Sequence, residues 1–241
     1  MPPKGEQASL GAARREAEVG AIARLPQAVI FDMDGLLLDT EPLAARAWDE
    51  AAAAVGTTFD PAMARAMIGR NFRDGSAMLR AASAPGYPAD AILSRWHTTY
   101  DAIVERDGLA LKPGVFELIE WLEARGIVRA VATSTRRERA QAKLARTALL
   151  PRFAILVGGD EVARGKPAPD IHLEAARRLG AAPDRCLVLE DSEPGIRGAL
   201  AAGMVPVMVP DLLPATDELL AQGVVVHESL HGVAEALARL A

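Results

Sequence analysis

The segment 28–40 constrains the fold of this chain more than any other. Its first four residues, 28–31, are apolar and have the composition of a strand that is buried on both faces. Two acidic residues, Asp32 and Asp34, follow directly, and Gly35 comes next. Buried carboxylates are costly unless a cation offsets their charge. In an open α/β sheet, ligands bind at the carboxyl ends of the strands, so we expect a metal-assisted reaction centred on Asp32.

The size and charge of the chain narrow the class of protein. Half of its 241 residues are hydrophobic, which is enough for one substantial core with a modest second domain. The formal net charge is −5, with acidic and basic residues interspersed. Such a pattern offers no basic face for nucleic acid and no basic amphipathic helix for a membrane surface. We therefore expect a small soluble molecule as the partner.

Cysteine usage and the absence of membrane or export signals favour a cytoplasmic location. Cys186 is the only cysteine, which excludes an internal disulfide, and its apolar surroundings predict a small buried hydrophobe. The longest apolar stretch, around 199–209, is interrupted by Gly203 and Pro206 and is too short to span a bilayer. Residues 1–25 lack the apolar segment of a signal peptide, so we interpret them as a frayed or weakly helical N-terminal extension.

Every element that the sequence predicts between residues 41 and 111 is a helix. Thr40 is in position to cap the first of them, which has a proline at its first position. The regions on either side, 26–40 and 112–241, alternate between strand and helix, so 41–111 is predicted to be an inserted helical module. The first predicted helix covers 42–56, a second begins at residue 61, and a third covers 73–82. A longer fourth helix carries an apolar stripe at Ile92, Trp96, Tyr100 and Ile103.

The rest of the chain has the alternation of strands and helices that is typical of a parallel sheet. Short apolar runs alternate with amphipathic segments that end at glycines. This pattern predicts a sheet wound right-handedly with helices on both faces. After 28–31, strands are predicted at 128–132, 153–157, 186–189 and 205–209, and helices at 115–126, 137–148, 170–179, 194–203 and 230–240.

Three further polar clusters follow predicted strands. Each has an ordinary interpretation when taken alone: a hydroxyl run caps a helix, a lysine lies in a solvated loop, and an acidic pair starts a turn. Because the carboxyl ends of parallel strands meet at one edge of a sheet, these groups and Asp32 can share one site. The clusters are Thr133-Ser134-Thr135, Gly165-Lys166-Pro167 and Glu190-Asp191-Ser192.

The ordered set of motifs resembles the haloacid dehalogenase (HAD) superfamily. The likeness rests on Asp32-Met-Asp34-Gly, on Thr133 after a strand, on Lys166 in Gly-Lys-Pro-Ala-Pro-Asp, and on Glu190-Asp191. The helical insert after the first motif is similar to the α-helical cap of the phosphatase and β-phosphoglucomutase-like subfamily. The resemblance covers roughly residues 28–209 and implies a Rossmann-like parallel α/β core, 26–40 and 112–241, with an all-helical cap, 41–111.

The resemblance also implies a magnesium ion and a phosphorylated substrate. A carboxylate about 4 Å from a phosphate charge is repelled by about 4 kcal/mol at an effective dielectric near 20, which slows attack about a thousandfold. A cation held by Asp32 and Asp191 offsets this repulsion, and hard oxygen ligands favour Mg²⁺. In the family's pattern, the backbone carbonyl of Asp34 also ligates the metal. Glu190 ligates directly or through water, and Lys166 contacts a phosphate oxygen.

The same comparison implies a division of roles in hydrolysis of a phosphomonoester. Asp32 acts as the nucleophile that forms an aspartyl-phosphate, and Asp34 protonates the leaving oxygen and then deprotonates the hydrolytic water. Thr133 and the amide of Ser134 bind the phosphoryl group, or Thr135 replaces Thr133 if the strand ends two residues later. Together with Lys166, Asp32, Asp34 and Thr133 are the predicted catalytic residues.

Alternatives within and outside the superfamily remain. Dehalogenases resemble this chain in fold but lack the second aspartate, and phosphonate cleavage requires a cap lysine, which 41–111 does not contain. A phosphosugar mutase of the β-phosphoglucomutase type carries a histidine four residues after the threonine that matches Thr40. Ala44 occupies that position in this chain, which favours hydrolysis without excluding transfer. A non-enzymatic phospho-accepting receiver shares the acids, hydroxyl and lysine but has no helical insert.

Substrate selection is expected to reside in the cap, because the core motifs recognise only the phosphoryl group and the metal. Arg73, with Arg70 second, is predicted to contact the leaving group. Gly35 is grouped with the substrate-binding residues because it lets the backbone turn after the acids. Asp39 is interpreted as a hinge or capping residue and His97 as a packing or surface residue. We expect a small phosphorylated metabolite as substrate and a monomer or weak dimer.

Overall fold

The computed structural model describes residues 24–241, and nearly all of the predicted extension 1–25 lies outside them. A six-stranded sheet forms the core, with the strand order β3-β2-β1-β4-β5-β6 and every neighbouring pair parallel. The prediction of a Rossmann-like parallel α/β core is therefore confirmed. The strands are β1 (Ala28–Phe31), β2 (Val128–Ala132), β3 (Ile155–Val157), β4 (Cys186–Glu190), β5 (Val205–Met208) and β6 (Val225–Val226).

Strand β1 lies in the middle of the sheet and is buried on both faces. It pairs with β2 on one side and with β4 on the other, so that Phe31 lies opposite Val131 and Leu189. Val29 and Phe31 belong to the core on one face of the sheet, while Ala28 and Ile30 belong to the core on the other. This double burial explains why the strand consists of four consecutive apolar residues instead of alternating with polar ones.

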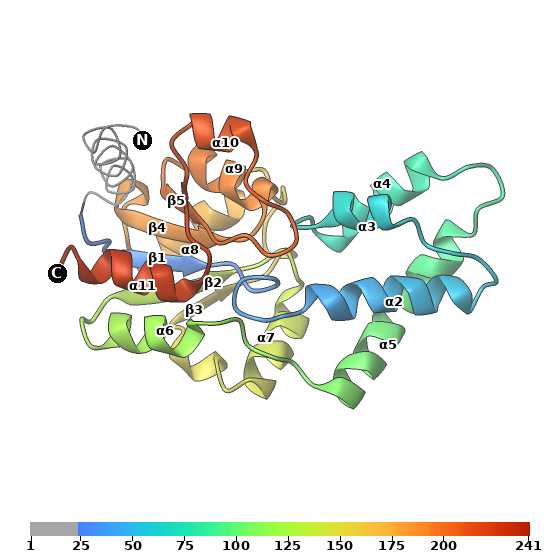
Figure 1. The fold of residues 1–241 in the computed structure, drawn as a ribbon, viewed down its shortest axis with the longest axis horizontal. Coiled ribbons are helices and arrows are strands. Elements are labelled where there is room, and N and C mark those ends of the chain that lie inside the picture. The colour runs from blue at the N-terminus through green and yellow to red at the C-terminus, as the bar shows by residue number, and fades with distance from the viewer. Residues whose placement is uncertain (1–23) are drawn as a thin grey trace, which may run out of the picture.

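Helices cover both faces of the sheet (Figure 1). The core that contains Phe31 is completed by α6 (Val115–Glu123), α7 (Arg137–Arg146) and α11 (Leu230–Ala238). The opposite core is completed by α8 (Asp170–Leu179) and α9 (Glu193–Ala201), and Cys186 is buried there as predicted. Among the helices in residues 24–241, none has the length and apolarity that crossing a membrane requires.

Four helices form a separate body beside the sheet, which we call the cap (Figure 1). Its own core centres on Trp48, whose ring centroid lies 4.6 Å from that of Phe59 and 4.9 Å from that of Trp96. Side-chain caps fix two of the helix starts: Asp60 accepts from the amide of Ala62, and Asn71 from that of Asp74. The cap helices are α2 (Glu41–Ala53), α3 (Pro61–Met67), α4 (Phe72–Ala82) and α5 (Ala89–Asp107).

The chain leaves the core and returns to it through two linkers that pair with each other. The amide of Asp39 donates to the carbonyl of Ala110 at 2.9 Å, and the amide of Lys112 donates to that of Leu37 at 3.0 Å. Lys112 also forms ion pairs with Asp39 at 3.5 Å and with Asp211 at 2.7 Å. This pairing places the predicted hinge residue Asp39 where the two linkers meet.

The structure differs from the sequence-based prediction at short elements. The sheet has a sixth strand, β6, and a short helix α10 (Asp217–Ala221) precedes it; neither was expected. Both are too short to show a clear periodicity. The strand predicted at 153–157 begins only at Ile155, because residues 150–152 form a 3-10 turn. Thr40 stands at the start of α2, but its side chain makes no capping bond.

Candidate active site

Three buried carboxylates meet at the carboxyl edge of the sheet. Asp32 follows β1, while Glu190 ends β4 and Asp191 follows it, and these two strands are neighbours. Ligand oxygens of the three residues lie within 4.8 Å of one another, and all three side chains are buried. The sequence separates Asp32 from Asp191 widely, so it is the parallel pairing of β1 with β4 that forms this acidic cluster.

The side chain of Lys166 contacts two members of the acidic cluster. Its ammonium group donates to Asp32 and Glu190 and, at 3.2 Å, to the carbonyl of Ala132 at the end of β2. The side chain is 1% exposed. Burial alone would lower the pKa of Lys166, but the two carboxylates more than offset this effect and raise it. Lys166 is therefore a permanent cation, as its predicted contact with a phosphate oxygen requires.

The acidic cluster fits a divalent cation. Burial raises the pKa of Asp32 to about 8 even though Lys166 opposes the change, and burial together with Asp32 and Glu190 raises that of Asp191 well above its usual range. One ammonium group thus leaves an excess of buried negative charge. Carboxylate oxygens are the donors that Mg²⁺ prefers. Asp32 and Asp191 would hold the ion, because both oxygens of Glu190 already accept hydrogen bonds, from Lys166 and from Ser192, whereas Lys166 engages only Oδ1 of Asp32.

Gly35 allows the backbone to pass close to the acidic cluster. Its φ angle is +85°, and a β-carbon at this position would lie 2.3 Å from Oδ2 of Asp191. Any side chain at residue 35 would therefore displace a predicted metal ligand. This close approach gives Gly35 a steric role at the site beyond the turn that the sequence predicts.

The carboxylate of Asp34 lies beside the acidic cluster and has two charged or polar donors. Thr135 Oγ1 donates to Oδ2 at 2.7 Å and Lys143 Nζ donates to Oδ1 at 2.6 Å. Burial alone would raise the pKa of Asp34, but Lys143 and the hydrogen bonds hold it below its ordinary value. Thr133 is buried and its hydroxyl accepts from the amide of Thr135 at 3.1 Å. Thr133 thus keeps its predicted place at the strand end, while Thr135 contacts Asp34.

A cavity of about 720 Å³ opens above these groups, between the core and the cap. The core contributes Asp32, Asp34, Thr133 and Ser134 to its wall. The cap closes the cavity at the loop before α4, where the hydroxyl of Ser134 donates to the carbonyl of Gly69 at 3.0 Å. The cap side of the wall includes Arg70, Asn71, Phe72, Arg73, Trp96 and His97.

The two arginines predicted to bind the leaving group both reach the cavity. Arg73 pairs with its neighbour Asp74 at 3.1 Å, and its side chain is 69% exposed. Arg70 donates to the carbonyl of Ala66 at 3.3 Å. Their contact with a leaving group stays a prediction. The ring of His97 lies 4.3 Å from that of Phe72, in line with the predicted packing role.

Three residues of the site region were not predicted from the sequence. Lys143 lies on α7, which the sequence shows only as a polar, basic helix. Glu41 lines the cavity at the start of α2, and burial together with Asp34 raises its pKa to about 7. His172 is buried behind Lys166, 3.9 Å from Glu190, and burial lowers its pKa to about 3, so it is neutral. The only sequence signal for His172 was its place on the apolar face of the predicted helix at 170–179.

The fold and the site define a class of protein: Rossmann-like α/β proteins that carry acidic groups at the carboxyl edge of a parallel sheet beneath a helical cap. The model of the haloacid dehalogenase-like hydrolases matches residues 26–203, which is most of the chain. This protein belongs to that family, as its four motifs predicted.

Several relatives are named as phosphatases, and solved structures share the fold. A phosphorylated carbohydrates phosphatase from Thermotoga maritima is 35% identical over 74% of this chain and 82% of its own length. The fructose-1-phosphate phosphatase YqaB from Escherichia coli is 36% identical over 73% and 92%. The crystal structure of CbbY from Rhodobacter sphaeroides in complex with phosphate superposes with a TM-score of 0.76 at 28% identity, covering 89% of this chain and all of that one. The prediction of a phosphoric monoester hydrolase is confirmed.

Proposed function

We propose that this protein is a Mg²⁺-dependent phosphatase that hydrolyses a small sugar phosphate through an aspartyl-phosphate on Asp32. The observation that carries the proposal is the buried acidic cluster, which pairs with Lys166 and whose Asp32 lines a cavity that the cap covers. Relatives named as phosphatases of phosphorylated carbohydrates and of fructose 1-phosphate support the substrate class. We place the enzyme in the cytoplasm and assign residues 41–111 to the cap.

The residues of the site divide the reaction between them. Asp32 attacks phosphorus while Asp34, which takes up a proton when the anionic substrate binds beside it, gives that proton to the leaving oxygen. Asp34 then deprotonates the water that cleaves the aspartyl-phosphate. Lys166, Thr133 and the amide of Ser134 bind the phosphoryl oxygens. A bound Mg²⁺ would neutralise charge on the phosphate and hold the Asp32 carboxylate ionised. The side chains of Asp32 and Asp191 and the carbonyl of Asp34 are its proposed protein ligands.

The cavity has room for a leaving group as large as a sugar. Its wall combines apolar rings from the cap with Glu41, Arg70 and Arg73. Aromatic and aliphatic surfaces pack against the carbons of a sugar, while charged groups bind its hydroxyls. A sugar phosphate can contact both the apolar rings and the charged groups of the wall. This agrees with the substrates for which the relatives are named.

Hydrolysis is favoured over phosphosugar transfer by the residue at position 44. Ala44 lines the same cavity as Asp34, at the position where the mutases carry a histidine. An alanine offers no proton donor or acceptor to a second sugar hydroxyl. Water is then the acceptor that the site can activate through Asp34, which gives net hydrolysis.

Turnover of phosphate esters tests the proposal. With Mg²⁺, the protein should release many equivalents of phosphate from p-nitrophenyl phosphate and from members of a panel of hexose and pentose phosphates. EDTA and the substitution Asp32→Asn should each abolish release. A receiver-like protein would give at most one equivalent, and a mutase would convert a sugar phosphate to its isomer without releasing phosphate. Wild-type rates in Asp32→Asn would refute the covalent mechanism.

A further inference from the structure

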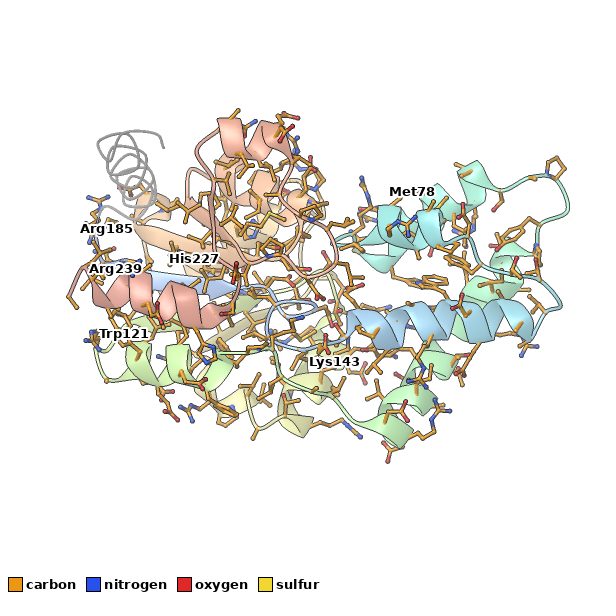
Figure 2. The ribbon with its side chains drawn as sticks, in the orientation of Figure 1. Met78, Trp121, Lys143, Arg185, His227 and Arg239 are labelled. Atoms are coloured by element: carbon orange, nitrogen blue, oxygen red, sulfur yellow. The ribbon has the colours of Figure 1, made fainter. Side chains whose placement is uncertain are left out.

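Lys143 is a buried cation that the proposed mechanism does not use. It lies on α7 in the core, where the core meets the cap (Figure 2). Its ammonium group is 2.6 Å from Oδ1 of Asp34, and its side chain is 13% exposed. A surface ion pair contributes little to stability, and a buried pair costs desolvation energy. A lysine placed against the proton-transfer residue at this cost requires a functional explanation.

We propose that Lys143 is a positioning residue that fixes the orientation of the Asp34 carboxylate and ties it to the seating of the cap. The inference rests on the proposed function, in which Asp34 transfers the proton. A carboxylate held by one donor can still rotate about its Cβ–Cγ bond. Thr135 holds Oδ2 at 2.7 Å and Lys143 holds Oδ1 at 2.6 Å, so both oxygens of Asp34 are fixed by the core.

The cap holds Lys143 in turn. The ammonium group of Lys143 lies 4.8 Å from the centre of the ring of Tyr100, which belongs to α5 of the cap. A cation over an aromatic face is attracted by the ring's electrons, more strongly where water is excluded. Tyr100 is 2% exposed. The lysine is thus placed between the acid it orients and a cap residue that covers it.

The same face of α7 carries two further cations that pair with α5. Arg139, Lys143 and Arg146 are spaced by four and three residues, which places them on one side of the helix. Arg139 donates to Asp101 of the cap at 3.1 Å, and Arg146 pairs with Glu105 at 2.7 Å. These two pairs flank Lys143 and align α5 with α7.

The packing of the cap helix α5 on α7 is therefore coupled to Asp34 through Tyr100 and Lys143. When α5 rests on α7, Tyr100 covers Lys143, and the ammonium group has Asp34 as its anionic partner. When α5 moves away, Lys143 loses the ring and gains access to water, so its hold on Asp34 weakens. The coupling makes proton transfer to the leaving group efficient only when the cap encloses the substrate.

The test compares two substrates that differ in their need for a proton. An alkyl leaving group must be protonated as it departs, whereas p-nitrophenolate leaves as a stable anion. The value of kcat/KM reports the steps up to the first irreversible one, which is formation of the aspartyl-phosphate. Lys143→Met should lower kcat/KM by roughly tenfold or more for the best substrate of the sugar phosphate panel. For p-nitrophenyl phosphate the loss should stay within about threefold.

Matched variants separate positioning from cap seating and from folding. Arg146→Met removes a cap contact on the same face but leaves both donors to Asp34 in place, so its loss of kcat/KM for the sugar phosphate should be much smaller than that of Lys143→Met. Lys143→Arg keeps the cation and should restore much of the selective loss. Thermal unfolding with and without Mg²⁺ shows that each variant is folded.

The results that overturn the inference are distinct from failure of the proposed function. Equal losses on both substrates in Lys143→Met, or no loss on either, would remove Lys143 from the positioning of Asp34. The proposed function itself fails if the wild type releases no phosphate from either substrate. If Lys143→Met does not fold, Tyr100→Leu decides the question, because it removes the ring that covers Lys143 and leaves the lysine in place. A loss confined to the alkyl ester supports the inference, and an equal loss on both substrates overturns it.

Discussion

The hydroxyl of Ser134 in the core donates a hydrogen bond to the carbonyl of Gly69 in the cap, at 3.0 Å. This bond joins the loop after β2, which carries the proposed phosphoryl-binding residues, to the loop that precedes α4. At the same point a β-carbon on Gly69 would lie 2.5 Å from Oγ of Ser192. The cap therefore meets the core at a residue with no side chain, directly above the site.

Gly69→Ala should hinder closure of the cap. The added methyl group collides with Ser192, so we expect KM for sugar phosphates to rise several-fold, and the positive φ angle should lower the melting temperature by a few degrees. Gly56→Ala is the matched control. Its φ angle of +76° is close to the +75° of Gly69, but no atom lies within 4 Å of the added carbon. Equal kinetic effects in the two variants would mean that backbone strain, and not the contact with Ser192, is responsible.

The stabilisation by Mg²⁺ should increase with pH. The raised pKa values of Asp32, about 8, and Asp191 mean that the folded protein without metal takes up protons. Their contribution to stability is present below the unfolded pKa, near 4, and is lost as the pH rises through the folded values. Metal binding needs the ionised carboxylates. The rise in melting temperature on adding Mg²⁺ should thus be larger at pH 8 than at pH 5.5.

Asp191→Asn provides the control for that measurement. It removes one proposed ligand and retains the side-chain volume, so the Mg²⁺-dependent rise in melting temperature should shrink at every pH. A rise that is independent of pH in the wild type would contradict the assignment of the metal to this cluster.

Lys166→Met should destabilise the protein without metal. Removing one partner of a buried ion pair costs about 3–5 kcal/mol, and the carboxylates of Asp32 and Glu190 would be left with no cation. Urea unfolding measures the loss, and added Mg²⁺ should restore part of it. Lys112→Met is the comparison, because Lys112 also pairs with two carboxylates but is 23% exposed and lies at the hinge. A loss in Lys166→Met that is no larger than the loss in Lys112→Met would contradict the role of Lys166 as the buried cation of the acidic cluster.

Arg73→Ala should affect sugar phosphates more than p-nitrophenyl phosphate. We expect a rise in KM or a fall in kcat for the sugar substrate, since Arg73 lines the cap side of the cavity. Arg80→Ala is the control, because Arg80 pairs with Asp90 in the cap at 2.7 Å and does not line the cavity. An equal loss on both substrates in Arg73→Ala would exclude Arg73 from specificity.

The parallel core and the residues of the acidic cluster could be predicted because both follow from strand ends. Asp32 and the pair Glu190-Asp191 each come directly after a buried apolar run, and a parallel sheet brings such positions together. The same reasoning placed Lys166 and Thr133 near them. The contacts of Thr135 could not be separated from those of Thr133, because a difference of two residues lies within the error of any predicted strand end.

Residues that reach the site from the middle of a helix could not be predicted. Lys143 follows no strand, and its spacing on α7 fits an exposed basic face equally well. Its burial depends on α5, an element of the inserted cap, and the packing of cap on core is not encoded in any local pattern. The strand β6 was missed for a related reason, since two residues pair with β5 only because the sheet already exists.

The paired linkers have a consequence for how such proteins diversify. Because the backbone leaves the core at Leu37 and returns beside it at Lys112, the whole cap occupies the position of a single surface loop. The entropic cost of closing a loop grows only with the logarithm of its length. Helices can therefore be lengthened, exchanged or replaced between these two points without altering the register of the sheet, and a new leaving group can be accommodated on an unchanged chemical core.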